Sequence, residues 1–182
     1  MINKSLFPLT LVFILVLSLS SCGAIVKSKA KKYATVEKGA IPVDFGKNNM
    51  VVLFVTSGKK SYDKYLKSNI KKAYQGKYEL VSKSELTADK YSDTDKYQYV
   101  FDYKSVSYAY HSDNSVIYGQ SAHTGMNNAT GQVRRFLITD RTNDKEYVMS
   151  MTSGFWSKLQ RMYLKNMEEV RAQNNGASML SK

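Results

Sequence analysis

The stretch Met50-Val51-Val52-Leu53-Phe54-Val55, residues 50–55, is an unbroken apolar run that is rich in β-branched valine. A run of this length and composition is typical of a strand that is covered on both faces. The next residues, Thr56-Ser57-Gly58-Lys59-Lys60, predict a turn. Their Gly-Lys pair lacks the earlier glycine of a phosphate-binding loop, so we interpret them as an ordinary turn. We therefore expect residues 50–55 to be the central strand of a sheet.

A helix and a second strand are expected directly after this turn. Ser61 is a candidate N-cap, apolar residues recur at helical spacing as far as Tyr74, and Gly76 predicts the end of the helix. Tyr78-Glu79-Leu80-Val81 predicts a short strand, and residues 84–89 predict one helical turn. This part of the chain is therefore expected to form a strand–helix–strand unit.

Residues 97–103 alternate with period two, which is typical of a strand. The aromatic side chains expected on one face of this strand are those of Tyr97, Tyr99, Phe101 and Tyr103. We treat this face as a candidate interaction surface, and packing of the four rings beneath the helices is the alternative. Beyond this stretch the apolar positions shift by one residue, so a β-bulge or a strand break is expected near Lys104–Ser105.

The rest of the chain predicts further strands and a final helix. Strands are expected at residues 115–121, 133–139 and 146–151, with a hairpin turn at 140–144. The final helix is expected to begin at Thr152 or Ser153 and to end at Asn174-Asn175-Gly176, which leaves residues 177–182 as a flexible tail.

The predicted elements follow the order β-α-β-β-β-β-β-α. This order predicts an α+β fold, in which a mostly antiparallel sheet of about five or six strands carries two helices on one face. Residues 49–176 are expected to form a single domain, since a chain of this length can bury one core.

The N-terminus has the pattern of a secretory signal. Lys4 is followed by an apolar run at residues 6–17 and then by small residues up to Ser21. The run is shorter than the roughly 20 residues that a membrane-spanning helix needs, and Pro8 interrupts it. Residues 1–21 are therefore predicted to be a signal peptide.

Cys22 is the only cysteine of the chain. Leu19-Ser20-Ser21-Cys22 resembles the lipobox of bacterial lipoproteins, and this resemblance implies cleavage before Cys22 and attachment of diacylglycerol to its sulfur. A free thiol or an intermolecular disulfide is the alternative. With no other cysteine, the fold uses neither an internal disulfide nor a thiolate metal site.

Residues 22–48 are rich in lysine and show little apolar periodicity, so they predict a basic tether beside the lipid anchor. Ile41, Pro42, Val43 and Phe45 are expected to dock at the edge of the domain. The chain has a formal net charge of +12. Most of this charge is scattered lysine, which favours attraction to anionic lipid or an envelope polymer over binding to nucleic acid.

The two histidines, His111 and His123, are the strongest candidates for chemistry. Pairing of their strands would bring them close to Asp113 and would allow a hydrolase or a ligand-binding site. No third metal ligand is spaced convincingly, and Ser121 lacks the strand-to-helix turn that exposes a nucleophile. Asp102 is expected on the polar side of its strand. We therefore predict no catalytic residue, no metal and no cofactor.

The strand–helix unit that leads into Gly76-Lys77-Tyr78-Glu79-Leu80-Val81-Ser82-Lys83-Ser84-Glu85-Leu86, together with the hairpin Asp140-Arg141-Thr142-Asn143-Asp144-Lys145-Glu146, resembles envelope lipoproteins similar to the curli secretion channel. The resemblance covers residues 49–153. It implies a lipid-anchored α/β domain in the periplasm, often oligomeric, and some members form a pore. The leucine- and proline-rich N-terminal belt of the channel proteins is absent here.

Three functions are compatible with these patterns. The first is a lipid-anchored, non-catalytic envelope protein on the periplasmic side of the outer membrane, which binds another envelope protein or itself. The second is a subunit of an outer-membrane secretion pore that inserts a hairpin at residues 97–121. The third is a hydrolase or ligand-binding protein that uses the region of His111 and His123.

Overall fold

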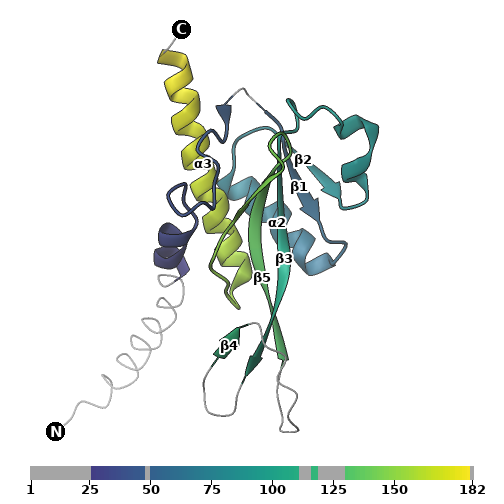
Figure 1. Ribbon diagram of the computed structural model, residues 1–182, viewed down its shortest axis with the longest axis vertical. Helices are drawn as coiled ribbons and strands as arrows, with labels where there is room; N and C mark the ends of the chain where they lie inside the picture. Colours follow the sequence, from purple (N-terminus) through teal and green to yellow (C-terminus); the bar gives the residue numbers. More distant parts are fainter. Residues whose placement is uncertain (1–25, 48–49, 111–115, 119–129, 181–182) are drawn as a thin grey trace, which may run out of the picture.

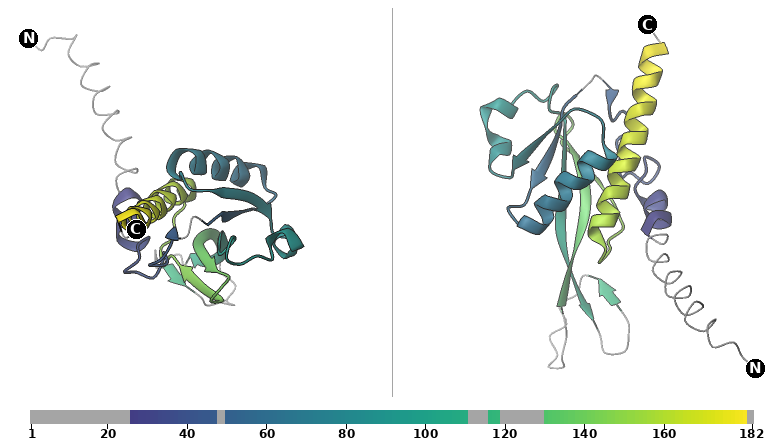
Figure 2. Two further views of the ribbon diagram at one scale, coloured as in Figure 1. Left: turned by 90° about the horizontal axis from the view of Figure 1, so that it is seen from above. Right: turned by 180° about the vertical axis from the view of Figure 1, so that it is seen from behind.

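The structure is a computed structural model that describes residues 26–47, 50–110, 116–118 and 130–180. It has an α+β fold, in which a mixed six-stranded sheet carries a helical layer on one face (Figures 1 and 2). The strands are β1 (Val52–Thr56), β2 (Tyr78–Ser82), β3 (Tyr99–Tyr110), β4 (Val116–Tyr118), β5 (Thr130–Asp140) and β6 (Lys145–Val148). The long helices are α2 (Lys60–Ala73) and α3 (Trp156–Leu180), and residues 26–33 are also helical.

The sheet order is β2-β1-β3-β5-β6, and β4 pairs with β3. β1 is parallel to both of its neighbours, β2 and β3, while the other pairs are antiparallel. The α+β class is therefore confirmed, and the run at residues 50–55 supplies most of β1, an interior strand with a neighbour on each side. Two parallel pairings give the sheet a more mixed character than the sequence predicted.

β1 is buried on both faces, as its sequence predicted. Val52 and Phe54 belong to the main core beneath the helices, whereas Leu53 and Val55 belong to a smaller core on the opposite face. The chain covers the first face with α2. It covers the second face with residues 83–98, which include the short 3-10 turns η2 (Glu85–Thr87) and η3 (Asp89–Tyr91).

α2 and α3 pack against each other through a buried polar contact. The Asn69 side-chain amide donates hydrogen bonds to Gln160 Oε1 at 2.8 Å and to the Ser157 carbonyl at 3.0 Å.

The N-cap of α2 is Lys59 rather than the predicted Ser61. The Asp63 carboxylate accepts the Ser57 N–H at 2.8 Å instead, and this contact holds the turn before the helix.

The predicted basic tether is wrong over residues 26–47, because this segment is part of the domain. Val26, Ala30 and Ala34 are buried at four-residue spacing against the helical layer. The Asn166 side chain donates to the carbonyls of Ala30 and Ala34, at 3.3 and 2.8 Å. The small size of the alanines made this helical face inconspicuous among the lysines.

The remainder of the segment also enters the main core. Ile41 and Phe45 are fully buried, and the Phe45 ring lies 5.2 Å from that of Tyr99 and 6.5 Å from that of Tyr74. Val43 is 69% exposed and does not take part. The domain therefore includes residues 26–47, ahead of its predicted start at residue 49.

The predicted bulge near Lys104–Ser105 is also wrong. β3 pairs with β5 in continuous register through Lys104↔Arg135 and Ser105↔Arg134. Lys104 and Ser105 are both exposed, so neither face of the β3–β5 ribbon has to carry apolar residues at this point. The apolar positions can therefore move from one face of β3 to the other without a bulge in the backbone.

The predicted C-terminus of the last helix needs correction as well. α3 begins at Trp156 and continues past Gly176 to Leu180, so residues 177–180 are helical rather than a tail. A glycine ends a helix most effectively when it takes a positive φ, and Gly176 does not. The predicted hairpin at 140–144 is confirmed, with Asp144 at a φ of 47° in its turn.

Replacing Phe45 by Ala is expected to lower the free energy of unfolding by about 3–5 kcal/mol, because it removes a fully buried ring from the main core. Val43→Ala in the same segment is the matched control and should change it by less than about 0.5 kcal/mol. Urea unfolding followed by circular dichroism measures both. A neutral effect of Phe45→Ala would restore the interpretation of this segment as a tether.

Candidate functional site

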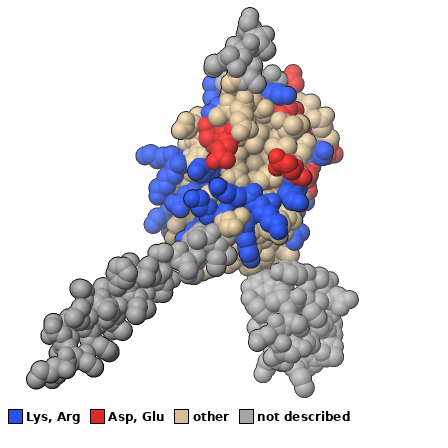
Figure 3. All heavy atoms as spheres, turned by 90° about the vertical axis from the view of Figure 1, so that its left-hand side faces the viewer, with Lys and Arg blue, Asp and Glu red and all other residues tan. Residues whose placement is uncertain are grey.

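Basic side chains gather on the outer surface of the helical layer. Because Val26 and Ala30 face inward, the lysines of this helix face outward. We call the exposed cations of this helix, of the last turn of α2 and of the first half of α3 the basic band: Lys27, Lys29, Lys31, Lys32, Lys71, Lys72, Lys158, Arg161 and Lys165. Figure 3 shows Lys and Arg side chains crossing this face, with acidic side chains farther toward the C-terminal end of α3.

The basic band is an electrostatic surface rather than a set of ion pairs. Among the described residues, its only salt bridge joins Lys165 to Glu169 at 3.9 Å, within α3. Cations close to an anionic membrane contribute about 1 kcal/mol each, and salt screens this attraction. A surface of this kind suits an extended anionic partner better than a single small ligand.

A groove lies within the basic band, where residues 26–33, α2 and α3 meet. It encloses about 600 Å³. Lys27, Lys72, Arg161 and Lys165 supply its cations, and the apolar part of its lining includes Met162. All three helical segments therefore contribute to one concave site.

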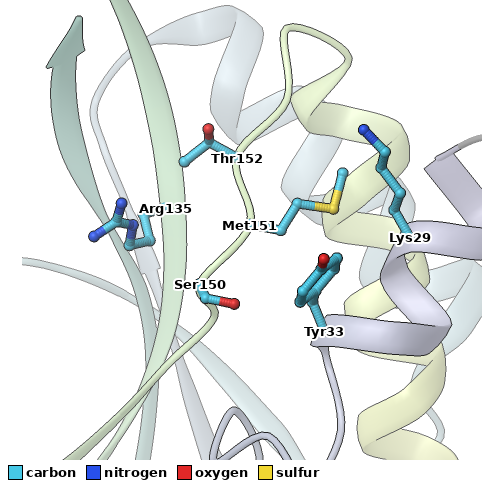
Figure 4. Close-up of a pocket in the computed structure, with 6 residues that line it drawn as sticks. All are labelled: Lys29, Tyr33, Arg135, Ser150, Met151 and Thr152. Atoms are coloured by element: carbon cyan, nitrogen blue, oxygen red, sulfur yellow. The ribbon is translucent and has the colours of Figure 1, made fainter. Parts of the chain in front are cut away.

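A second cavity, of about 470 Å³, lies between the helix at 26–33, β5 and the segment that leads into α3. In the close-up of Figure 4, Tyr33 and Met151 face each other across it, and Ser150 and Thr152 lie nearby. The Arg135 guanidinium points away from Lys29. Because the two cations do not converge, we assign no ligand to this cavity.

A third cavity, of about 530 Å³, lies where β1 and β2 end, beside β3. Ser57, Lys83 and Asp102 line it. Open α/β sheets commonly bind ligands at the carboxyl ends of parallel strands, so the position is a natural one for a small polar ligand.

Asp102 is the chemically distinctive group of this third cavity. Burial raises the pKa of its carboxyl, against the opposing effects of the Tyr103 N–H, which donates to Oδ1 at 2.7 Å, and of nearby Lys83. Asp102 lies on the face of β3 opposite Phe101, as predicted, but it is partly buried there rather than fully exposed. The neighbouring ends of β1 and β2 bury part of the Asp102 side chain. The β3 sequence alone could not predict where those two strands end.

The predicted aromatic interaction surface is not available at the surface. Tyr99 and Phe101 are fully buried in the main core, and Tyr103 packs against that core. The Tyr99 hydroxyl donates to Asp44 Oδ1 at 2.9 Å. This arrangement is the alternative in which the rings pack beneath the helices.

Tyr97 does not share the face of these three rings. It precedes β3 and is 2% exposed in the smaller core, where its ring lies 5.1 Å from that of Tyr91. Its hydroxyl donates to Glu79 Oε1 at 3.0 Å. The alternation in the sequence begins before the strand does, which is why Tyr97 was assigned to the wrong face.

Arg134, which the sequence did not single out, stacks on aromatic rings at the base of the β3–β5 ribbon. Its guanidinium carbon lies 4.4 Å from the ring centre of Trp156, 5.3 Å from that of Tyr103 and 5.6 Å from that of Tyr62. These cation–π contacts join the ribbon to both α2 and α3. They stabilise the position of the ribbon.

The other sequence-predicted residues, Cys22, His111, Asp113 and His123, lie outside the described residues. Within the described part of the chain, no group of three His, Cys, Asp or Glu side chains is arranged to hold a metal ion. No described helix is both long enough and apolar enough to cross a membrane.

Comparison with known proteins adds no assignment. No family model, no curated protein and no solved structure matches this chain. The resemblance to envelope lipoproteins similar to the curli secretion channel therefore stays a prediction.

Replacing Asp102 by Asn is expected to raise the free energy of unfolding near neutral pH. Burial holds the folded-state pKa of Asp102 above the usual value for an aspartate carboxyl, so the wild type loses stability as the pH rises through the folded pKa. The gain from the substitution should vanish below the unfolded value. Urea unfolding over a pH series measures it, with exposed Asp95→Asn as the control. A pH-independent difference would show that Asp102 does not titrate abnormally.

Proposed function

We propose that this protein is a lipid-anchored, non-catalytic protein of the bacterial cell envelope, which acts by binding another envelope protein or itself. The observation that best supports this is the short link between Cys22 and the domain. Val26 is already buried in the main core, four residues after Cys22. Four residues span at most about 14 Å, so an acyl chain on Cys22 would hold the domain directly at the bilayer surface.

The layers of the fold would then orient the protein. The helix at 26–33 belongs to the helical layer and carries the chain that leads from Cys22, so this layer would face the membrane. The opposite face of the sheet would point away from the bilayer. Over β3 and β6 that face presents exposed polar side chains such as Lys104 and Glu146, which form an ion pair. We propose this open face of the sheet as the surface that a partner meets.

The other two functions receive less support. Insertion of residues 97–121 as a pore hairpin conflicts with the burial of Tyr99 and Phe101 beneath the helices. The hydrolase or ligand-binding function around His111 and His123 depends on residues outside the described part of the chain. The periplasmic side of the outer membrane remains the proposed location.

Mass spectrometry of the native protein is expected to show a mature chain that begins at Cys22 with fatty acyl groups on that residue. Cys22→Ser should leave the uncleaved precursor, because the modified sulfur is required before cleavage. The lipoprotein assignment would be withdrawn if the native protein kept Met1 or an unmodified thiol.

A photo-crosslinking amino acid in place of Glu146 is expected to form a covalent adduct with another envelope protein, or with a second copy of this chain, in intact cells. The control is the same amino acid in place of Lys158 in the basic band, which should give little protein adduct. Immunoblotting and mass spectrometry identify the products. Adducts at neither position, together with a monomeric purified protein, would argue against an interaction role.

A further inference from the structure

The groove between residues 26–33, α2 and α3 brings together cations from three separate segments. Lys27 comes from the first helix, Lys72 from the last turn of α2, and Arg161 and Lys165 from successive turns of α3. All four residues are exposed. Like charges repel one another, so this convergence is unfavourable unless solvent or an anionic ligand compensates it.

The carboxylates of the groove compensate only part of this charge. Glu168 is committed elsewhere, because it binds the Arg171 guanidinium at 2.6 and 2.8 Å and accepts the Gln75 N–H at 3.0 Å. Glu169 Oε1 lies 3.9 Å from Lys165 Nζ and so pairs with one of the four cations. Among the described residues, neither Lys27 nor Arg161 has a salt-bridge partner. The groove therefore has an excess of positive charge.

The lining is apolar as well as basic. Ala73 and Met162 contribute apolar surface between the cations. This combination fits a ligand that carries a phosphate next to a hydrocarbon portion, since the phosphate can pair with the cations while the remainder covers the apolar surface. None of the described residues that line the groove is aromatic, so they offer no platform on which a nucleobase could stack.

The position of the groove identifies the source of such a ligand. Lys27 is five residues from Cys22, a span of at most about 18 Å. We propose that the groove binds the phosphate headgroups of anionic lipids in the membrane that carries the anchor, and so fixes the domain with its helical layer against the bilayer. This proposal rests on the proposed lipid anchor, which determines the membrane that the groove meets.

The test uses the chain from Gly23 onward, without acyl groups, so that the anchor cannot hide the contribution of the groove. In the part of the chain that the structure describes, the main core begins at Val26, so this chain retains all of that core. Co-sedimentation is measured with vesicles of phosphatidylcholine alone and of phosphatidylcholine mixed with phosphatidylglycerol. Binding is expected only to the mixed vesicles, and it should weaken as salt is added.

Charge reversal then separates the groove from the overall charge. Lys72→Glu with Arg161→Glu is expected to weaken binding to mixed vesicles by about tenfold or more, because two favourable contacts become repulsive. The matched control, Lys83→Glu with Lys96→Glu, makes the same change in net charge on exposed residues of the segment that covers the opposite face of the sheet. It should weaken binding by less than about threefold. Lys27→Gln, which leaves α2 and α3 intact, should give an intermediate loss.

Three results would overturn the proposal. They are equal loss in the groove and control variants, equal binding to the two kinds of vesicle, and tighter groove-dependent binding to duplex DNA than to mixed vesicles. Thermal unfolding verifies that each variant is folded, and Lys27→Gln decides the question if the double variant is not. An unmodified Cys22 in the native protein would refute the lipid anchor but not lipid binding by the groove. Vesicle binding by the chain without acyl groups tests the groove separately.

Discussion

Burial of β1 on both faces is the constraint on which the rest of this structure depends. Leu53 and Val55 point to one side, and Val52 and Phe54 point to the other. Full burial of each such side chain stabilises the fold by roughly 1.5–3 kcal/mol, so neither face can be left to solvent. The chain must therefore cross both faces, with α2 on one and residues 83–98 on the other. These two crossings place β2 and β3 on either side of β1 and leave the cavity beside Asp102 where β1 and β2 end.

Covering the helical side of β1 requires more than α2. Phe54 lies within 5.5 Å, ring centre to ring centre, of both Tyr74 and Phe101, and the rings of Phe101 and Tyr163 are equally close. Phe45 occupies the adjacent position against Tyr99. Residues 26–47 are thus the third component of the helical layer, next to α2 and α3. A segment that completes a core cannot also be a loose tether, so only the few residues between Cys22 and Val26 separate Cys22 from the core along the sequence.

Much of this fold could be predicted from sequence where one local signal dominates. The apolar run of β1, the spacing of Tyr62, Leu66 and Ile70 in α2, and the turn before Lys145 each act over a few residues. The errors arise where tertiary packing decides instead. Ala30 and Ala34 bury little area, so their pattern was weak, yet close approach to Asn166 depends on their small size. Tyr97 is buried and Asp102 is partly buried by contacts with other segments of the chain, which local periodicity cannot reveal.

The structure also changes how the charge of this protein should be understood. In a flexible tether, lysines would only add to the affinity for a membrane, because each could meet the surface independently. Here the lysines of 26–33 are fixed on one side of a helix whose other side is buried, and they stand next to cations of α2 and α3. Electrostatic attraction that acts on a rigid surface favours one orientation as well as proximity. A short link to Cys22 and a basic helical layer would then act together, and both would leave the open face of the sheet directed away from the lipid.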